Sequence, residues 1–143
     1  MIALGCDHGG FHLMKEVKKY LDEHGLDYKD FGTYDDASCD YPDYAEKVAK
    51  AIQSGECERG ILTCGTGIGI TIAANRYKGI RAANCTNVFM AQETRKHNDA
   101  NILGMGERVI GVGTALMILE TFLNTPFSEG ERHVRRIRKL EEI

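Results

Sequence analysis

Short apolar runs alternate along the chain with longer segments in which apolar residues recur every three or four positions. Runs of the first kind are typical of buried strands, and the three-to-four spacing is typical of helices with one buried face. The apolar runs predict strands at residues 2–6, 27–31, 60–63 and 80–84, and a fifth strand from residue 102.

The segments between these strands carry helix signals. The predicted helices cover residues 11–24, 41–54, 70–77, 88–96 and 114–123, with a last helix from about residue 129. Pro42 suits the first turn of its helix, and Gly25 and Gly55 stand where helices end.

The alternation of strand and helix predicts a parallel sheet covered on both faces. We therefore expect residues 1–143 to form a single α/β domain, a three-layer αβα sandwich around a five-stranded, doubly wound sheet of the Rossmann-like or flavodoxin-like kind. With the strand order 2-1-3-4-5, strands one and three would lie side by side at the switch point, where ligands bind beyond the strand ends.

Composition narrows the class of function. Lys and Arg together number 18 against 21 for Asp and Glu, a net charge of −3, which argues against a nucleic-acid or membrane-surface binder and favours small-molecule chemistry. The five cysteines show no C-x-x-C or Cys/His ligand spacing, so no metal is expected. The chain starts with a strand-like run and has no bilayer-length apolar run, so we expect a reduced, cytoplasmic protein.

The stretch from residue 60 to residue 76 changes from strand to helix across a loop with three alternate glycines, Gly65, Gly67 and Gly69, separated by Thr66 and Ile68. Glycines let a ligand approach the backbone, and free N–H groups at a helix start attract anions. Cys64 would then be a thiol at the rim of an oxyanion cradle. The alternative is close packing around a small buried cysteine.

Asp7 and His8 follow the first strand and would share a crevice with the glycine loop, because the first and third strands are neighbours in the expected order. They could act as an acid/base pair, although Asp7 could equally cap the next helix. Tyr41 could cover the same pocket or simply pack beside Pro42.

Further candidates lie in the second half of the chain. His97 and Asn98 end the fourth predicted helix, where a histidine could act in a functional loop or merely complement the helix dipole. Arg132 and Arg136 are four residues apart and could clamp a phosphate, or form a solvated basic face. Arg108, beside a glycine turn, presents the same choice.

With these residues in view, the chain closely resembles the type B ribose-5-phosphate isomerases, in the wider family that also holds the galactose-6-phosphate isomerase subunits. The matching stretches are residues 5–10 (GCDHGG), 40–43 (DYPD), 64–69 (CGTGIG), 95–98 (RKHN), 106–108 (GER) and 132–136 (RHVRR). The resemblance implies isomerisation between ribose 5-phosphate and ribulose 5-phosphate in the non-oxidative pentose phosphate pathway. It also implies no metal or organic cofactor, and a homodimer whose active sites draw on both subunits; whether dimers pair further is left open.

The resemblance also implies roles for single residues. Cys64 matches the base that moves a proton between C2 and C1; some family members use a later glutamate instead, but Thr71 and its neighbours offer no carboxylate. His97 matches the acid that helps open the sugar ring. The other matching positions are substrate or phosphate contacts, with Gly65 to Gly69 and the Thr66 hydroxyl around the enediolate oxygen: Asp7, His8, Tyr41, Gly65, Thr66, Gly67, Ile68, Gly69, Asn98, Arg108, Arg132 and Arg136.

Rival functions are weighed on the same residues. An isomerase of allose or galactose 6-phosphate would share the base and the phosphate clamp, so the sequence leaves it open. A dinucleotide-binding module is disfavoured because Ile70 stands where the last glycine of G-x-G-x-x-G is needed and no acid follows the fourth strand. A sugar-phosphate sensor without activity would not need Cys64 and His97.

Overall fold

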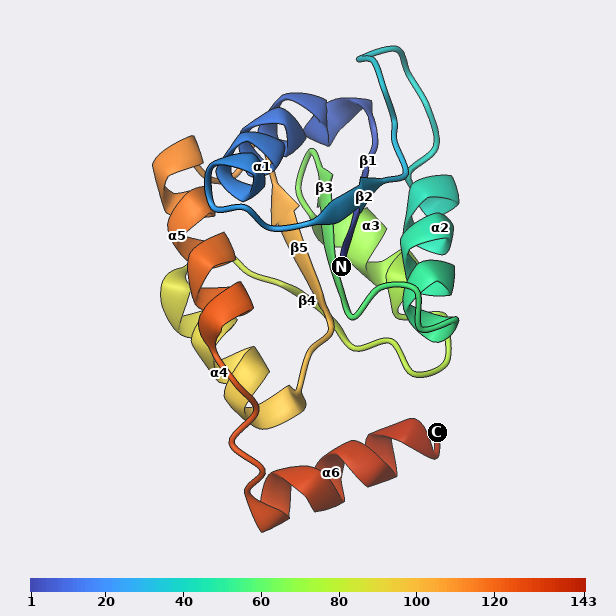
Figure 1. The fold of residues 1–143 in the computed structure, drawn as a ribbon. Coiled ribbons are helices and arrows are strands. Elements are labelled where there is room, and N and C mark those ends of the chain that lie inside the picture. The colour runs from blue at the N-terminus through green and yellow to red at the C-terminus, as the bar shows by residue number, and fades with distance from the viewer.

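A computed structural model describes all of residues 1–143, and one parallel sheet runs through its centre (Figure 1). The strands are β1 (Ile2–Cys6), β2 (Tyr28–Asp30), β3 (Arg59–Cys64), β4 (Ala82–Asn84) and β5 (Ile102–Gly106). The helices are the short 3₁₀ helix η1 (His8–Gly10) and α1 (Phe11–Glu23), α2 (Tyr41–Gln53), α3 (Ile68–Ala74), α4 (Val88–Asn98), α5 (Val112–Asn124) and α6 (Glu131–Glu141). The predicted α/β class and parallel five-stranded sheet are confirmed.

The strand order is β2-β1-β3-β5-β4, so the expected order 2-1-3-4-5 is wrong at one end of the sheet. β5 pairs with both β3 and β4, and β4 forms the edge. All five β5 residues are buried, whereas the three residues of β4 are only half-buried, so the more apolar strand takes the central position. β1 and β3 are neighbours, as expected.

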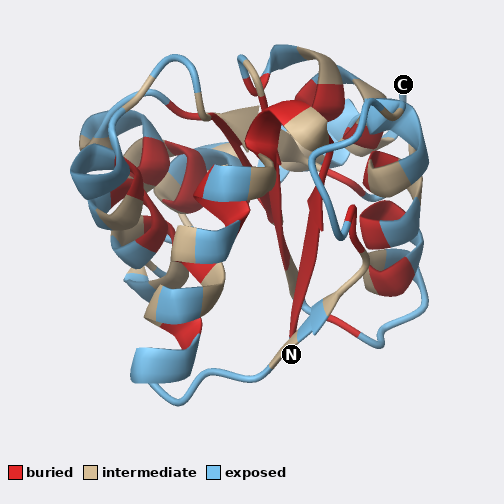
Figure 2. Cartoon of the chain, turned by 90° about the horizontal axis from the view of Figure 1, so that it is seen from above, coloured by how far each residue is buried: buried red, intermediate tan, exposed pale blue.

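Helices cover both faces of the sheet. On one face α2 and α3 pack over a cluster that includes Val48, Leu62 and Ile70. On the other face α1, α4 and α5 enclose the larger cluster, which includes Leu4 and Phe122. Figure 2 shows buried residues along the central strands and on the inward sides of the helices, as a parallel sheet requires.

Element boundaries differ from prediction at several places. α3 ends at Ala74 instead of near residue 77, and β4 begins at Ala82 instead of residue 80. β5, predicted only to begin at residue 102, continues to Gly106, and the glycine at that position allows the neighbouring loop to lie directly on the strand. α6 begins at Glu131, two residues late, because Glu129 has a positive φ of 59° that no right-handed helix accepts.

α6 lies at one end of the molecule, at the bottom of Figure 1, and contacts α4. None of its residues is buried, and Val134 and Leu140 are exposed apolar residues on it.

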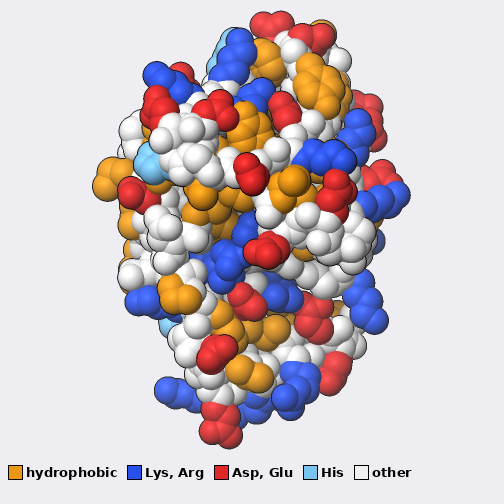
Figure 3. Space-filling model, viewed as in Figure 1, with side chains coloured by type: hydrophobic (Ala, Val, Ile, Leu, Met, Phe, Trp, Pro, Cys, Tyr) orange, Lys and Arg blue, Asp and Glu red, His pale blue; other side chains and the backbone are white.

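On the surface of the whole molecule, acidic and basic side chains are interspersed over the face shown in Figure 3. Among the helices, none combines the length and the apolar character that a membrane span requires.

Candidate active site

The loops that follow β1, β3 and β5 meet at the carboxyl edge of the sheet. Cys6 is in register with Thr63 on β3, and Cys64 with Gly106 on β5. The Thr63 hydroxyl donates a hydrogen bond of 2.7 Å to the carbonyl of Gly10, which joins the first loop to the third strand. The loops after strands one and three therefore lie side by side, as predicted.

Cys64 ends β3 with a side chain that is only 5% exposed. The N–H of Gly67 donates to the Cys64 sulfur over 3.0 Å, so the glycine loop curls back over the thiol. Gly67 has a φ of +79°, which a residue with a side chain rarely adopts, and this explains why the curl needs glycine. The sulfur of Cys64 therefore has a fixed backbone hydrogen-bond donor.

The loop directs its carbonyl groups inward and leaves N–H groups free. The Gly65 carbonyl accepts from the Arg108 N–H at 2.9 Å, and the Gly67 carbonyl accepts from the Thr71 hydroxyl at 2.6 Å. Three residues of the loop that are not buried, Gly65, Thr66 and Gly69, have backbone N–H groups that make no hydrogen bond within the chain. Such donors beside a base can stabilise negative charge on a substrate oxygen.

Thr66 and Ile68 stand on the outer side of this loop, where both are exposed. The Ile68 N–H donates to the Thr66 hydroxyl oxygen over 3.1 Å, so the hydroxyl caps the start of α3. The hydroxyl hydrogen remains available to a ligand above the loop, because the oxygen acts as the acceptor in that bond.

Asp7 serves as a helix cap, and both sequence interpretations of it stay compatible with the structure. Its Oδ1 atom accepts from the N–H groups of Gly9 and Gly10 at 2.8 and 3.2 Å, while Oδ2 takes no part in the cap. The neighbouring His8 accepts the N–H of Cys39 on Nδ1 at 3.3 Å. In neutral His8 the proton is therefore on Nε2, which is left to donate.

Tyr41 and Arg108 border the glycine loop on two sides. A Cβ atom added to Gly69 would come within 2.9 Å of the Tyr41 ring, so the ring lies directly against the start of α3. The Arg108 side chain lies in contact range of Gly65. Both side chains are exposed beyond these contacts, so they can reach a ligand in the crevice.

The other predicted residues lie at the opposite end of the sheet, where the strands begin. His97 and Asn98 end α4 immediately before β5 starts, and Arg132 and Arg136 belong to α6 beneath them (Figure 1). The first and last residues of β5 are about 13 Å apart, and that length of strand separates the end of α4 from Gly106, which is in register with Cys64. Within one chain the predicted site is therefore split in two.

His97 joins α4 to α6. Its ring stacks on that of His133 with centroids 4.2 Å apart and planes 11° apart, and its Nε2 lies 3.1 Å from a Glu93 carboxylate oxygen. Loss of hydration lowers the pKa of His133, and the neighbouring His97 and the arginines on α6 lower it further. The arginines thus give this end of the chain a positive surface suited to an anion.

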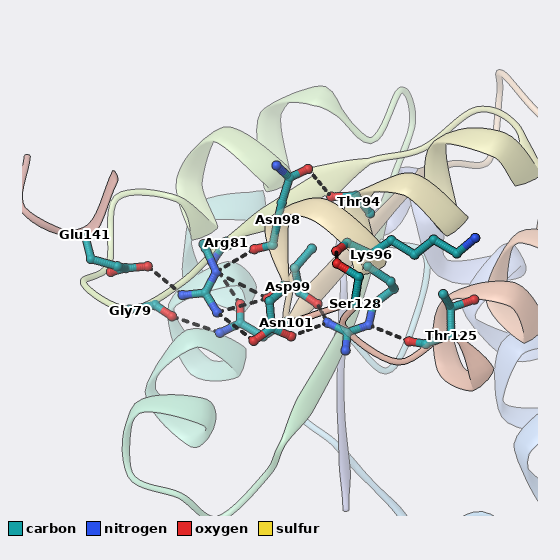
Figure 4. A network of polar contacts seen from close by, with 12 residues as sticks. Gly79, Arg81, Thr94, Lys96, Asn98, Asp99, Asn101, Thr125, Ser128 and Glu141 are labelled. Carbon is teal, nitrogen blue, oxygen red and sulfur yellow. Dashed lines mark hydrogen bonds and ion pairs between the residues drawn. The ribbon is translucent and has the colours of Figure 1, made fainter. Parts of the chain in front are cut away.

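A polar network secures the same end of the sheet (Figure 4). The Arg81 guanidinium donates to the carbonyl groups of Asn98 and Asp99 and pairs with Glu141 of α6. Beside this network lies a hollow of about 850 Å³, lined by residues 75–83, parts of α4 and the end of α6. The hollow is remote from Cys64.

The remaining cysteines differ from Cys64 in their surroundings. All five are free thiols. Burial raises the pKa of Cys6 to about 12 and that of Cys85 to about 11, and burial and Glu56 raise the pKa of Cys57, so these three remain protonated thiols at neutral pH. Cys39 is half-buried beside His8.

Two residues near the thiol had no assigned role in the sequence. Glu107 accepts the N–H of Leu13 at 2.7 Å and donates its own N–H to the Cys64 carbonyl at 2.9 Å, which joins the three loops. Asn84 donates from Nδ2 to the Thr66 carbonyl at 3.4 Å. The sequence offered a hint for Glu107, because it follows a glycine in one of the matching stretches. For Asn84 the only hint was its position at the end of a predicted strand.

Comparison with known proteins agrees with this architecture. The Ribose/Galactose Isomerase family model matches residues 2–140. Ribose-5-phosphate isomerase B of Escherichia coli is 46% identical over 99% of this chain and 95% of its own length. The solved ribose-5-phosphate isomerase B structures of Clostridium thermocellum and Thermotoga maritima each superpose with a TM-score of 0.97 over 99% of this chain, at 53% and 54% identity and covering 95% and 97% of those chains. The chain belongs to the ribose/galactose isomerase family.

Proposed function

We propose that this protein is an aldose–ketose isomerase that interconverts D-ribose 5-phosphate and D-ribulose 5-phosphate. The observation that carries the proposal is Cys64, whose sulfur accepts the Gly67 N–H and which precedes a glycine loop with three unpaired backbone N–H groups. Relatives with 46% to 54% identity over nearly the whole chain are ribose-5-phosphate isomerases B, which favours a pentose phosphate over a hexose phosphate.

In the proton transfer, Cys64 acts as the base. Its thiolate takes the proton from C2 of the open-chain aldose, the C1 carbonyl oxygen becomes negative, and an enediolate forms. The thiol then returns the proton to C1 while the proton on the C2 hydroxyl passes to the negative O1, so that a carbonyl forms at C2, which gives the ketose and regenerates the thiolate. The free N–H groups of the glycine loop and the Thr66 hydroxyl hold the negative oxygen, and fixed donors of this kind are worth several kcal/mol, about 3 for a single one.

Ring opening must come first, because ribose 5-phosphate is mostly a closed furanose. In this step His97 gives a proton to the ring oxygen as its bond to C1 breaks, and the C1 hydroxyl loses its proton to water. A histidine suits this task because it titrates near neutral pH. Asp7, through Oδ2, and His8, through Nε2–H, would bind sugar hydroxyl groups in the crevice, with Tyr41 beside them and Asn98 next to the acid.

A second copy of the chain would complete the site. In one chain the base and the ring-opening acid are at opposite ends of the sheet, too far apart to act on one sugar. α6 buries none of its residues and exposes Val134 and Leu140, which leaves an apolar face for another subunit. In a homodimer, Arg132 and Arg136 of one subunit would bind the phosphate over the crevice of the other, opposite Arg108.

An activity assay tests the reaction. Ribulose 5-phosphate formation from ribose 5-phosphate is measured in excess chelator, with allose and galactose 6-phosphates as alternative substrates. We expect turnover of the pentose, and a loss of at least about 100-fold in Cys64→Ala, because a positioned base contributes a factor of that size. Cys57→Ala, a buried cysteine distant from the crevice, is the matched control and should remain active. Turnover of a hexose phosphate alone would refute the substrate assignment.

Mixing two inactive variants tests the shared site. Cys64→Ala and His97→Asn dimers each have two damaged sites, but a mixed dimer would contain one site with both residues intact. Random exchange of subunits makes half of the dimers mixed, so activity should return to about a quarter of the wild-type value. If mixing restores nothing although subunits exchange, base and acid are not supplied by different chains.

A further inference from the structure

The peptide group between Thr66 and Gly67 decides what faces the Cys64 sulfur. Its N–H is the donor that lies 3.0 Å from the sulfur. This peptide is trans, so its carbonyl points in the opposite direction. Rotating the peptide by half a turn would exchange the two groups and turn a carbonyl oxygen toward the thiolate, which would repel it.

Glycine makes such a rotation easy. Gly67 has a φ of +79°, and glycine adopts negative φ with little difference in energy. The orientation of the peptide must therefore be held by contacts outside the loop. On one side lies Gly106 of β5, where an added Cβ would come within 2.4 Å of the Thr66 carbonyl carbon. Gly106 limits how closely the peptide can approach β5, but as a glycine it has no side chain that could hold the peptide by a hydrogen bond.

Asn84 supplies the polar contact. It stands at the end of β4, and its Nδ2 donates to the Thr66 carbonyl over 3.4 Å, on the side away from the thiol. Its Oδ1 lies against Gly67, where an added Cβ would be only 2.3 Å away. That oxygen is buried without a hydrogen-bond partner, the only side-chain nitrogen or oxygen in the chain in that state. An unpaired buried oxygen costs stability, so packing alone does not explain an asparagine here.

We propose that Asn84 is a positioning residue for Cys64, which holds the Thr66 carbonyl so that the N–H of the same peptide stays on the sulfur. The inference deepens the proposed function, because it concerns the residue assigned there as base. Asn84 itself touches neither the sulfur nor the crevice above it. It acts through one peptide plane, and the cost of its buried oxygen is offset by the fixed donor at the thiolate.

Two substitutions of nearly the same shape test the proposal. Asn84→Leu removes both the donor and the unpaired oxygen, and Asn84→Asp replaces the donor with an oxygen that repels the Thr66 carbonyl. We expect kcat for ribose 5-phosphate to fall about tenfold in Asn84→Leu and further in Asn84→Asp, with KM within about twofold of wild type. The melting temperature of Asn84→Leu should equal or exceed that of wild type, because the buried unpaired oxygen is gone.

A second measurement needs no substrate. The rate of alkylation by iodoacetamide is followed for each cysteine by mass spectrometry at neutral pH, with the half-buried Cys39 as internal standard. We expect the ratio of Cys64 to Cys39 alkylation to fall about tenfold in Asn84→Leu, because the Cys64 sulfur loses its fixed hydrogen-bond donor. An unchanged ratio together with unchanged kcat would overturn the proposal, and so would losses that accompany a lower melting temperature. If wild type does not isomerise the sugar, the proposed function fails while the alkylation ratio still decides the role of Asn84.

Discussion

The contact between Gly106 and the glycine loop gives a sharp prediction for the substitution Gly106→Ala. A Cβ at this position would lie 2.4 Å from the carbonyl carbon and 2.5 Å from the oxygen of Thr66. Ordinary contact begins at 3.4 Å, so the loop must retreat by about 1 Å. The neighbouring N–H of Gly67 would then no longer lie on the Cys64 sulfur, and a displacement of that size at a reacting group costs about 100-fold in rate.

Activity and stability measured together decide this prediction. Overpacking against backbone costs about 2 kcal/mol, which should lower the melting temperature by about 8 °C and leave a folded protein. Gly111→Ala is the matched control, since that glycine follows the same strand, has a φ of −73° and has no atom within 4 Å of an added Cβ. If Gly106→Ala retains kcat within about twofold of wild type, the loop tolerates the shift and its fixed position is not what supports catalysis.

Two more predictions concern the loops and the core. Glu107→Ala should raise KM for ribose 5-phosphate several-fold and lower stability by about 1 kcal/mol, because the Leu13 N–H loses its acceptor and Arg108 loses its anchored neighbour. Glu107→Gln keeps an acceptor oxygen and should restore most of the affinity and stability. Equal losses in the two variants would contradict the anchoring role. Burial raises the pKa of Cys6 from 9.0 to about 12, so the folded state keeps a proton that the unfolded chain releases, and the stability from this group, complete below pH 9, is lost as pH rises toward 12. Denaturant unfolding should show a slope near 1.4 kcal/mol per pH unit that is smaller in Cys6→Ala; identical slopes would exclude Cys6 as the cause.

The sequence also carried a signal for strand order that periodicity alone did not use. The segment from residue 102 to residue 106 contains no polar side chain, whereas the preceding strand segment contains Arg81. A strand covered on both faces favours apolar side chains, so the more apolar segment became the inner strand and Arg81 bound the end of α4 at the edge of the sheet. The candidate residues themselves came from local motifs, and those beside Cys64 were predicted to share its crevice.

Local patterns in the sequence determined the alternation of strands and helices, the glycine loop after Cys64 and the chemical types of the candidate residues, because burial of one face and backbone freedom are properties of neighbours in the chain. Tertiary structure alone decided which groups meet. It placed β5 between β3 and β4, brought Asn84 and Glu107 to the loop, and separated His97 from Cys64 by the length of the sheet. Contacts of this kind depend on how segments distant in the sequence pack together, and the spacing of residues along the chain does not predict that packing.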